Sequence, residues 1–122
     1  MEADKVKALV TLAEDDVAPR FDLATEVLTA VVPPTGPLQK ERTMVLPRAS
    51  AEDLCRLILS EGVQVVICGG IEAEFYEYLT WKKIKVLDSI IGPWPRVLRE
   101  LQLGRLEAGS VLCDLPEGNP YA

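Results

Sequence analysis

Residues 63–72 read VQVVICGGIE, a short apolar run that ends in Cys68, Gly69 and Gly70 and leads directly into a helical pattern. The apolar run predicts a strand buried on both faces, as in a parallel sheet that is covered by helices. Two glycines permit a sharp turn and let the backbone approach a ligand closely. The next helix would point its free N–H groups back into that turn, which favours an anion. The stretch therefore predicts an α/β fold with a candidate site at the end of this strand.

The rest of the chain supplies four further strands and three helices around that stretch. The expected strands cover residues 5–13, 26–32, 41–46, 63–68 and 84–87, and the expected helices cover 50–62, 71–81 and 93–104. Three strands in succession favour an antiparallel meander, and the two strand–helix units that follow favour parallel additions. We therefore predict a mixed five-stranded sheet of order 3-2-1-4-5 with helices on both faces. Ligands of such sheets bind beyond the carboxyl ends of the strands at the switch point, here among residues 14–22, 68–72 and 88–93.

Composition excludes several classes of protein. The chain has 122 residues, of which 48% are hydrophobic and 26% charged, as in one soluble domain. No apolar run approaches the roughly 20 residues that span a bilayer, so we expect a cytoplasmic protein without membrane contact. The net charge of −6 disfavours nucleic acid as a partner. The absence of histidine removes the commonest general base and metal ligand, and three cysteines predict reduced thiols rather than disulfides.

Three short motifs carry a family resemblance. They are V-x-x-R-F-D at 17–22, EGVQVVICGGI at 61–71 and LGRLEAG at 103–109. In order and spacing they resemble the dinitrogenase iron–molybdenum cofactor biosynthesis family, which includes NifX, NafY and the C-terminal part of NifB. The resemblance covers residues 5–108, the predicted domain (1–108), and leaves 109–122 as a tail. It implies a ribonuclease-H-like three-layer fold and the binding or carriage of an iron–sulfur or iron–molybdenum cofactor precursor.

The chain departs from the family pattern in one loop. Where the family commonly has S-P-H-F-G, this chain has Ala18-Pro19-Arg20-Phe21-Asp22, so that Arg20 replaces a histidine. A neutral imidazole can ligate a metal, whereas a guanidinium cannot. Arg20 could instead contact a negatively charged cluster or carboxylate, or form a surface ion pair with the neighbouring acidic run.

The candidate cofactor-binding residues are therefore Arg20, Phe21, Cys68, Gly69 and Gly70, with Cys68 as the metal ligand. A thiolate at a helix N-terminus is stabilised by the helix dipole, but a cysteine at a strand end is also commonly a small buried core residue. The glycines lack the further residues of a nucleotide-binding loop. Phe21 could equally be core or the lid of a cleft.

These residues predict a non-enzymatic binding or carrier protein. The serines have no histidine partner that could activate them, and the first strand lacks the acidic residue that two-metal nucleases need. One thiol cannot hold a cluster alone, so a carrier requires exogenous ligands or a homodimer. The alternatives are a regulatory module that binds a small anion and a protein-interaction domain, both without metal. In the tail, residues 111–115 are expected to dock on the domain or on a second copy, and residues 117–122 to stay mobile.

Overall fold

The computed structural model describes residues 5–112 of the chain. Within these residues there are six strands, one 3-10 turn and three helices. The strands are β1 Val6–Ala13, β2 Asp16–Val17, β3 Glu26–Val32, β4 Gln39–Val45, β5 Val65–Ile67 and β6 Lys85–Leu87. The 3-10 turn is η2 Phe21–Leu23, and the helices are α1 Ala51–Ser60, α2 Ala73–Trp81 and α3 Trp94–Gln102.

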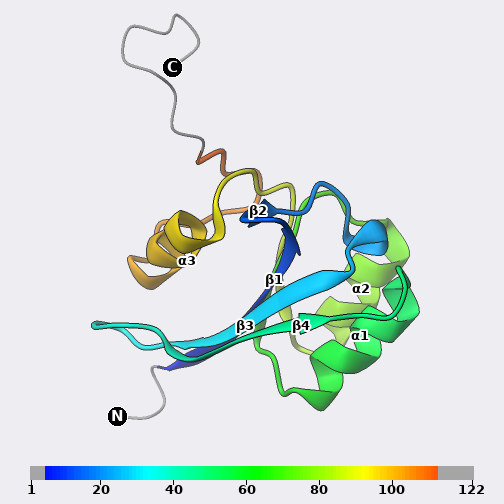
Figure 1. Ribbon diagram of the computed structural model, residues 1–122, viewed down its shortest axis with the longest axis horizontal. Helices are drawn as coiled ribbons and strands as arrows, with labels where there is room; N and C mark the ends of the chain where they lie inside the picture. Colours follow the sequence, from blue (N-terminus) through cyan, green and yellow to red (C-terminus); the bar gives the residue numbers. More distant parts are fainter. Residues whose placement is uncertain (1–4, 113–122) are drawn as a thin grey trace, which may run out of the picture.

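The sheet has the order β4-β3-β1-β5-β6, with β2 paired to β1 outside this path. β3 is antiparallel to both β1 and β4, whereas β5 is parallel to both β1 and β6. α1 and α2 cover one face of the sheet and α3 covers the other (Figure 1). The predicted order 3-2-1-4-5 and the three-layer α/β fold of the ribonuclease-H-like type are therefore confirmed.

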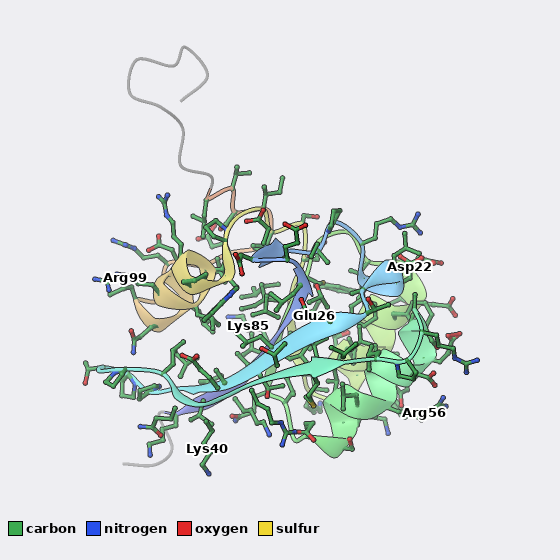
Figure 2. The ribbon with its side chains drawn as sticks, viewed as in Figure 1. Asp22, Glu26, Lys40, Arg56, Lys85 and Arg99 are labelled. Carbon is green, nitrogen blue, oxygen red and sulfur yellow. The ribbon has the colours of Figure 1, made fainter. Side chains whose placement is uncertain are left out.

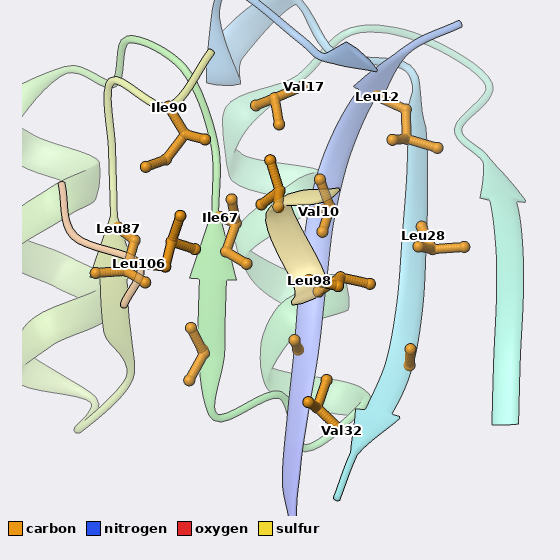
Figure 3. Close-up of a cluster of buried hydrophobic side chains, with 14 residues drawn as sticks. Val10, Leu12, Val17, Leu28, Val32, Ile67, Leu87, Ile90, Leu98 and Leu106 are labelled. Carbon is orange, nitrogen blue, oxygen red and sulfur yellow. The ribbon is translucent and has the colours of Figure 1, made fainter. Parts of the chain in front are cut away.

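Two hydrophobic cores follow from this layering, one on each face of the sheet. The α3-side core packs Leu98 of α3 over Val10 of β1 and Leu28 of β3 (Figure 3). The core on the α1/α2 side joins Leu54 and Ile58 of α1 to the other face of β1, β3, β5 and β6. Successive residues of β1 and β5 enter opposite cores, which is why β5 is apolar throughout and β1 is apolar except at Lys7 and Thr11.

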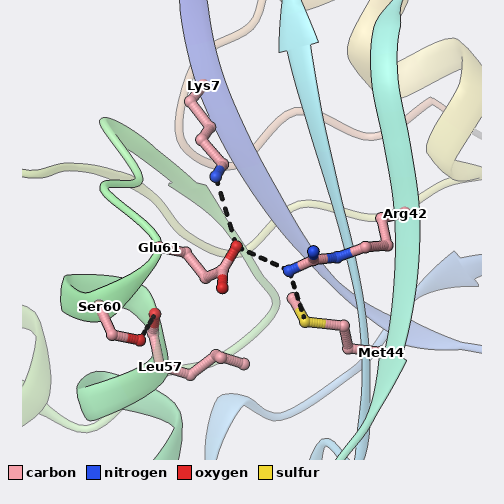
Figure 4. A network of polar contacts seen from close by, with 6 residues as sticks. All are labelled: Lys7, Arg42, Met44, Leu57, Ser60 and Glu61. Atoms are coloured by element: carbon pink, nitrogen blue, oxygen red, sulfur yellow. Dashed lines mark hydrogen bonds and ion pairs between the residues drawn. The ribbon is translucent and has the colours of Figure 1, made fainter.

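Charged side chains lie on the periphery and across one edge of the sheet. Glu61, which follows α1, accepts from Lys7 of β1 at 3.3 Å and from Arg42 of β4 at 2.8 Å (Figure 4). Of the charged residues labelled in Figure 2, Asp22 comes from η2, Glu26, Lys40 and Lys85 come from strands, and Arg56 and Arg99 come from helices. The ion pairs of Glu61 connect the edge strand β4 and the strand β1 to the end of α1. Because they are accessible to solvent, each contributes little to stability.

Helix boundaries follow local sequence signals. Ser50 is the N-cap of α1, because its Oγ accepts from the backbone N–H of Asp53 at 3.2 Å. Gly62 and Gly104 have φ values of +67° and +73°, the left-handed conformation that commonly follows a helix. The second helix begins at Ala73 rather than at Ile71, because the residue before it, Glu72, has an extended backbone.

No helix in residues 5–112 is both long enough and apolar enough to cross a membrane.

Candidate functional site

A cleft of about 580 Å³ opens beyond the carboxyl ends of β1, β5 and β6. It is formed by the three loops that the sheet topology predicted as the ligand site. The residues that line it are mostly apolar or glycine; they are Ala13, Asp16, Val17, Pro19, Gly69, Gly70, Ser89, Ile90, Ile91 and Gly92. The predicted position of the site at the switch point of the sheet thus coincides with a cavity.

Backbone hydrogen bonds between the three loops fix the shape of the cleft. Gly70 exchanges a pair of bonds with the segment before η2: its N–H donates to the Pro19 carbonyl and its carbonyl accepts from Phe21 N–H, both at 2.8 Å. On the other side, Val17 N–H donates to the Gly92 carbonyl at 2.9 Å. The segment that follows β1 is therefore held between the β5–α2 turn and the β6–α3 loop.

Gly69 lies where the backbone of two loops comes closest. A Cβ built on Gly69 would lie 2.6 Å from the carbonyl carbon of Pro19 and would also overlap the carbonyl oxygens of Ala18 and Pro19. All of these are backbone atoms, which cannot rotate away as a side chain can. The sequence predicted that the glycines let the backbone approach a ligand closely; in the structure, the group that approaches Gly69 is the chain's own Ala18–Pro19 segment.

The Cys68 side chain packs in the core on the α1/α2 side, and Cys68 is not among the residues that line the cleft. It is 0% exposed. Burial, and after it the charge of Asp88, raises the pKa of the Cys68 thiol to about 12. The thiol is therefore protonated at neutral pH, whereas metal ligation requires the thiolate. Its role as a metal ligand stays a prediction, and it would require this strand end to open.

Cys68 should make the protein less stable in alkali. Because the native pKa is about 12 and the ordinary value is 9.0, the unfolded chain releases this proton first as pH rises. The contribution of this thiol to the free energy of unfolding should be undiminished below pH 9 and should fall by roughly 1.4 kcal/mol per pH unit above it. In Cys68→Ala this part of the decline should disappear, as measured by urea unfolding between pH 8 and pH 11. An unchanged alkaline decline would show that the thiol is not buried in solution.

Arg20 and Phe21 are adjacent in sequence but point to different surroundings. The guanidinium of Arg20 forms a two-bond ion pair with Asp22, with Nε at 3.0 Å and Nη2 at 2.7 Å from the two carboxylate oxygens. The backbone of Arg20 pairs with Gly70, but its side chain is 57% exposed. Phe21 is 1% exposed in the core on the α1/α2 side, with its ring centroid 6.3 Å from that of Phe75. The surface ion pair and the core aromatic, both weighed from sequence, describe these residues in the structure.

The first residues of the predicted tail belong to the wall beside the cleft. Ile91 N–H donates to the Ser110 carbonyl at 3.0 Å, and Leu112 N–H donates to the Ile91 carbonyl at 2.7 Å. Leu112 also contacts Gly92, whose φ of +143° suits a residue without a side chain. Residues 111–115 were predicted to dock on the domain or on a second copy, and residues 111–112 are found on the domain itself. The remainder of the predicted docking segment and residues 117–122 lie outside the described residues.

Three residues of the cleft were not singled out from the sequence. Asp16 contributes the one carboxylate among the lining residues, and Ser89 contributes a hydroxyl that donates to Asp88 at 3.1 Å. Ser89 also has a φ of +58°, an uncommon conformation for a residue with a Cβ. Ile91, 52% exposed, adds an apolar wall. One residue of an acidic run and a single serine form no recognisable sequence motif. They could not be predicted as neighbours, because only the fold brings Asp16 and Ser89 to the same cleft.

Within residues 5–112, no group of three or more cysteine, aspartate or glutamate side chains is arranged to hold a metal ion. Cys55 is buried on α1, and burial, with a smaller effect of Glu52, raises the pKa of its thiol to about 11. The described residues therefore include two buried, protonated thiols on the α1/α2 side of the sheet. The cleft at the end of the sheet is largely apolar, and its polar side chains carry oxygen atoms only.

Comparison with known proteins was made by sequence and by structure. No family model matches the sequence, and no curated protein does. Among solved structures, PH0822 is 19% identical with a TM-score of 0.75, over 84% of this chain and 94% of the other. A "putative dinitrogenase" from Methanocaldococcus jannaschii is 18% identical with a TM-score of 0.69, over 84% and 93%.

A "putative NifB protein" from Thermotoga, described as a member of the DUF35 family, is 16% identical with a TM-score of 0.63, over 93% of this chain and 99% of the other. Identities this low establish likeness of fold, and the coverage shows that the likeness extends over nearly all of both chains. The predicted resemblance is thereby confirmed in the fold: this chain has the architecture of the solved dinitrogenase- and NifB-related proteins.

Proposed function

We propose that this protein is a non-enzymatic binding protein that holds a small ligand in the cleft at the ends of β1, β5 and β6. The cleft itself carries the proposal. It has a volume of about 580 Å³, lies at the switch point of the sheet and is walled by loops that are hydrogen-bonded to one another. A preformed cavity of this kind binds without the cost of ordering its walls.

The lining favours a neutral or cationic ligand with an apolar surface. Val17, Ile90 and Ile91 offer apolar contacts, Ser89 offers a hydroxyl and Asp16 offers the one charge, which is negative. No lysine or arginine is among the lining residues, and the nearby Arg20 is already paired with Asp22. A small anion would therefore have to attract Arg20 away from its partner, which makes the anion-binding alternative the weaker one.

The same lining supports binding without catalysis. The sequence has no histidine, and the Ser89 hydroxyl donates to the Asp88 carboxylate at 3.1 Å, a weaker base than the imidazole that commonly activates a serine. The glycines supply backbone and shape rather than groups that transfer protons. Binding and release are the chemistry for which this cleft is equipped.

A second candidate function is the carriage of a cofactor precursor, which the names of the similar structures favour. The residues described here do not fit direct ligation of such a cargo. Cys68 faces the core with a raised pKa, and the buried hydroxyl of Thr11, which has no hydrogen-bond partner in the described part of the chain, is a poor cluster ligand. A carried cluster would have to retain its own ligands and rest in the cleft.

Filling the cleft tests the proposed function. Ala13 lines the opening and is exposed, so Ala13→Trp should occupy the cleft without disturbing the core. In ¹H–¹⁵N spectra recorded with a panel of neutral, cationic and anionic fragments, we expect shifts at the amides of Gly69, Gly70 and Ser89. These shifts should disappear in Ala13→Trp and persist in Ala49→Trp, an exposed control near α1. Shifts elsewhere, or shifts that survive Ala13→Trp, would contradict a binding site in this cleft.

Anaerobic incubation with ferrous iron and sulfide tests the second candidate. If the cleft binds small molecules only, the protein should remain without charge-transfer absorption, and Cys68→Ser should behave identically. A stable absorption band that Cys68→Ser abolishes would show that the thiolate becomes a ligand, and the carrier function would then replace the one proposed. A band that instead disappears in Ala13→Trp would place an intact cluster in the cleft.

A further inference from the structure

The outer surface of α2 is unusually exposed for a helix with so many aromatic residues. Leu79 is the only buried residue of Ala73–Trp81, whereas Tyr78 is 38% and Trp81 is 71% exposed. The Tyr78 and Trp81 rings lie 6.4 Å apart, and the Lys82 ammonium lies 4.9 Å from the Trp81 ring centroid. Tryptophan and tyrosine are enriched at the centres of protein interfaces.

A pocket lies beside these aromatic residues. A pocket of about 320 Å³ between α1 and α2 is lined by Phe75 and Tyr78, by Cys55, and by the charged residues Glu52, Arg56 and Glu74. Its floor is apolar and its rim carries two carboxylates and one guanidinium. Such a pocket suits a large aromatic side chain that is accompanied by a positive charge.

Helical spacing relates this pocket to the exposed tryptophan by symmetry. With 3.6 residues per turn, Glu74 and Lys82 lie one turn on either side of Tyr78. Phe75 and Trp81 lie three residues on either side of Tyr78, on opposite flanks of its face. A two-fold axis through Tyr78, perpendicular to the helix, therefore superposes Trp81 of one copy on Phe75 of the other, and Lys82 on Glu74.

We propose that a second copy of this chain docks antiparallel along α2, with Trp81 of each copy inserted into the pocket between α1 and α2 of the other. Each inserted indole would cover the Phe75 and Tyr78 rings, and each Lys82 would face the carboxylate of Glu74. The interface is isologous, because the same helix supplies both the inserted side chain and the pocket. It is also small, so the dimer is expected to be weak and concentration-dependent.

Oligomeric state and tryptophan emission test this directly on the full chain. Sedimentation equilibrium from about 10 μM to about 1 mM should show a monomer–dimer equilibrium, with a blue shift of the emission as Trp81 leaves water. Trp81→Ala should leave a monomer throughout, whereas Leu103→Ala, which removes a side chain that is 50% exposed at the end of α3, should not alter the equilibrium. A monomer at all concentrations, or a dimer indifferent to Trp81→Ala, would overturn the proposal.

Two matched comparisons establish the geometry. Tyr78→Ala should weaken the dimer, whereas Tyr76→Ala should not, although Tyr76 is equally exposed at 39%, because it points away from the proposed face. Glu74→Lys and Lys82→Glu should each weaken association roughly tenfold, and the double variant should restore it. Glu74, Tyr76 and Tyr78 lie on the surface of α2 and Lys82 follows its last residue, so circular dichroism should show unchanged folding. Failure of the double variant to restore the dimer would exclude the antiparallel register.

Discussion

Gly69→Ala should be one of the most destabilising single substitutions in this protein. The added methyl group would overlap the backbone of Ala18 and Pro19. Both residues are held in place, because the Pro19 carbonyl accepts from Gly70 N–H and the Ala18 N–H donates to the Thr11 carbonyl, each at 2.8 Å. Relief requires the loop before η2 to move away from the end of β5, which would also open the cleft. We expect a loss of about 3 kcal/mol or more in the free energy of unfolding, measured by urea denaturation.

Gly70→Ala is the matched control for this substitution. A Cβ on Gly70 would lie 3.6 Å from the Pro19 carbonyl oxygen, an ordinary contact, and Gly70 has no positive φ. We expect a change within about 0.5 kcal/mol. Equal effects of the two substitutions would mean that the close approach at Gly69 does not exist in solution.

Phe21→Ala should be comparably damaging, although this residue was predicted from sequence as a ligand contact. The Phe21 ring is 1% exposed and packs against Phe75 and the core on the α1/α2 side. Removing it leaves a cavity under the loop that borders the cleft, and we expect a loss of about 3–5 kcal/mol in the free energy of unfolding.

Leu23 provides the control within the same 3-10 turn. It is 60% exposed, so Leu23→Ala should change stability by less than about 0.5 kcal/mol. If Phe21→Ala were instead well tolerated and affected only ligand binding, then Phe21 would belong to the cleft, as the sequence first indicated. Thermal unfolding followed by near-ultraviolet circular dichroism would distinguish the two results.

The order of strands could be predicted because the two central strands are apolar on both faces. β1 and β5 have no alternation, which places them between covered neighbours, and the alternation at Met44 and Val45 marks β4 as an edge. β2 could not be predicted. It has two residues, Asp16 and Val17, and exists because β1 supplies a partner at Leu12 and Ala13. Pairing this short is decided by tertiary contacts rather than by local propensity.

The location of the cleft was predictable from topology, whereas the direction of the side chains around it was not. In a strand buried on both faces, nothing in the sequence tells which residues point to which layer. The structure places Val66 and Cys68 in the core on the α1/α2 side and Val65 and Ile67 in the α3-side core. A one-residue shift would have reversed these assignments. Similarly, the sequence offers Arg20 several acidic neighbours as partners of an ion pair. The structure pairs it with Asp22, which lies in the 3-10 turn that follows Arg20.

The hydrogen bonds that close the cleft also bear on how the chain folds. Each of them joins segments far apart in sequence, such as Val17 to Gly92 and Phe21 to Gly70. The β1–β3–β4 meander needs only short-range pairing, whereas the cleft requires the later parallel strands to be in place. The meander should therefore form early and the cleft late. In native-state hydrogen exchange, the opening free energy should be lower for the amides of Val17 and Gly70 than for those of β1. A ligand bound in the cleft should raise the opening free energy of Val17 and Gly70 toward the value of β1.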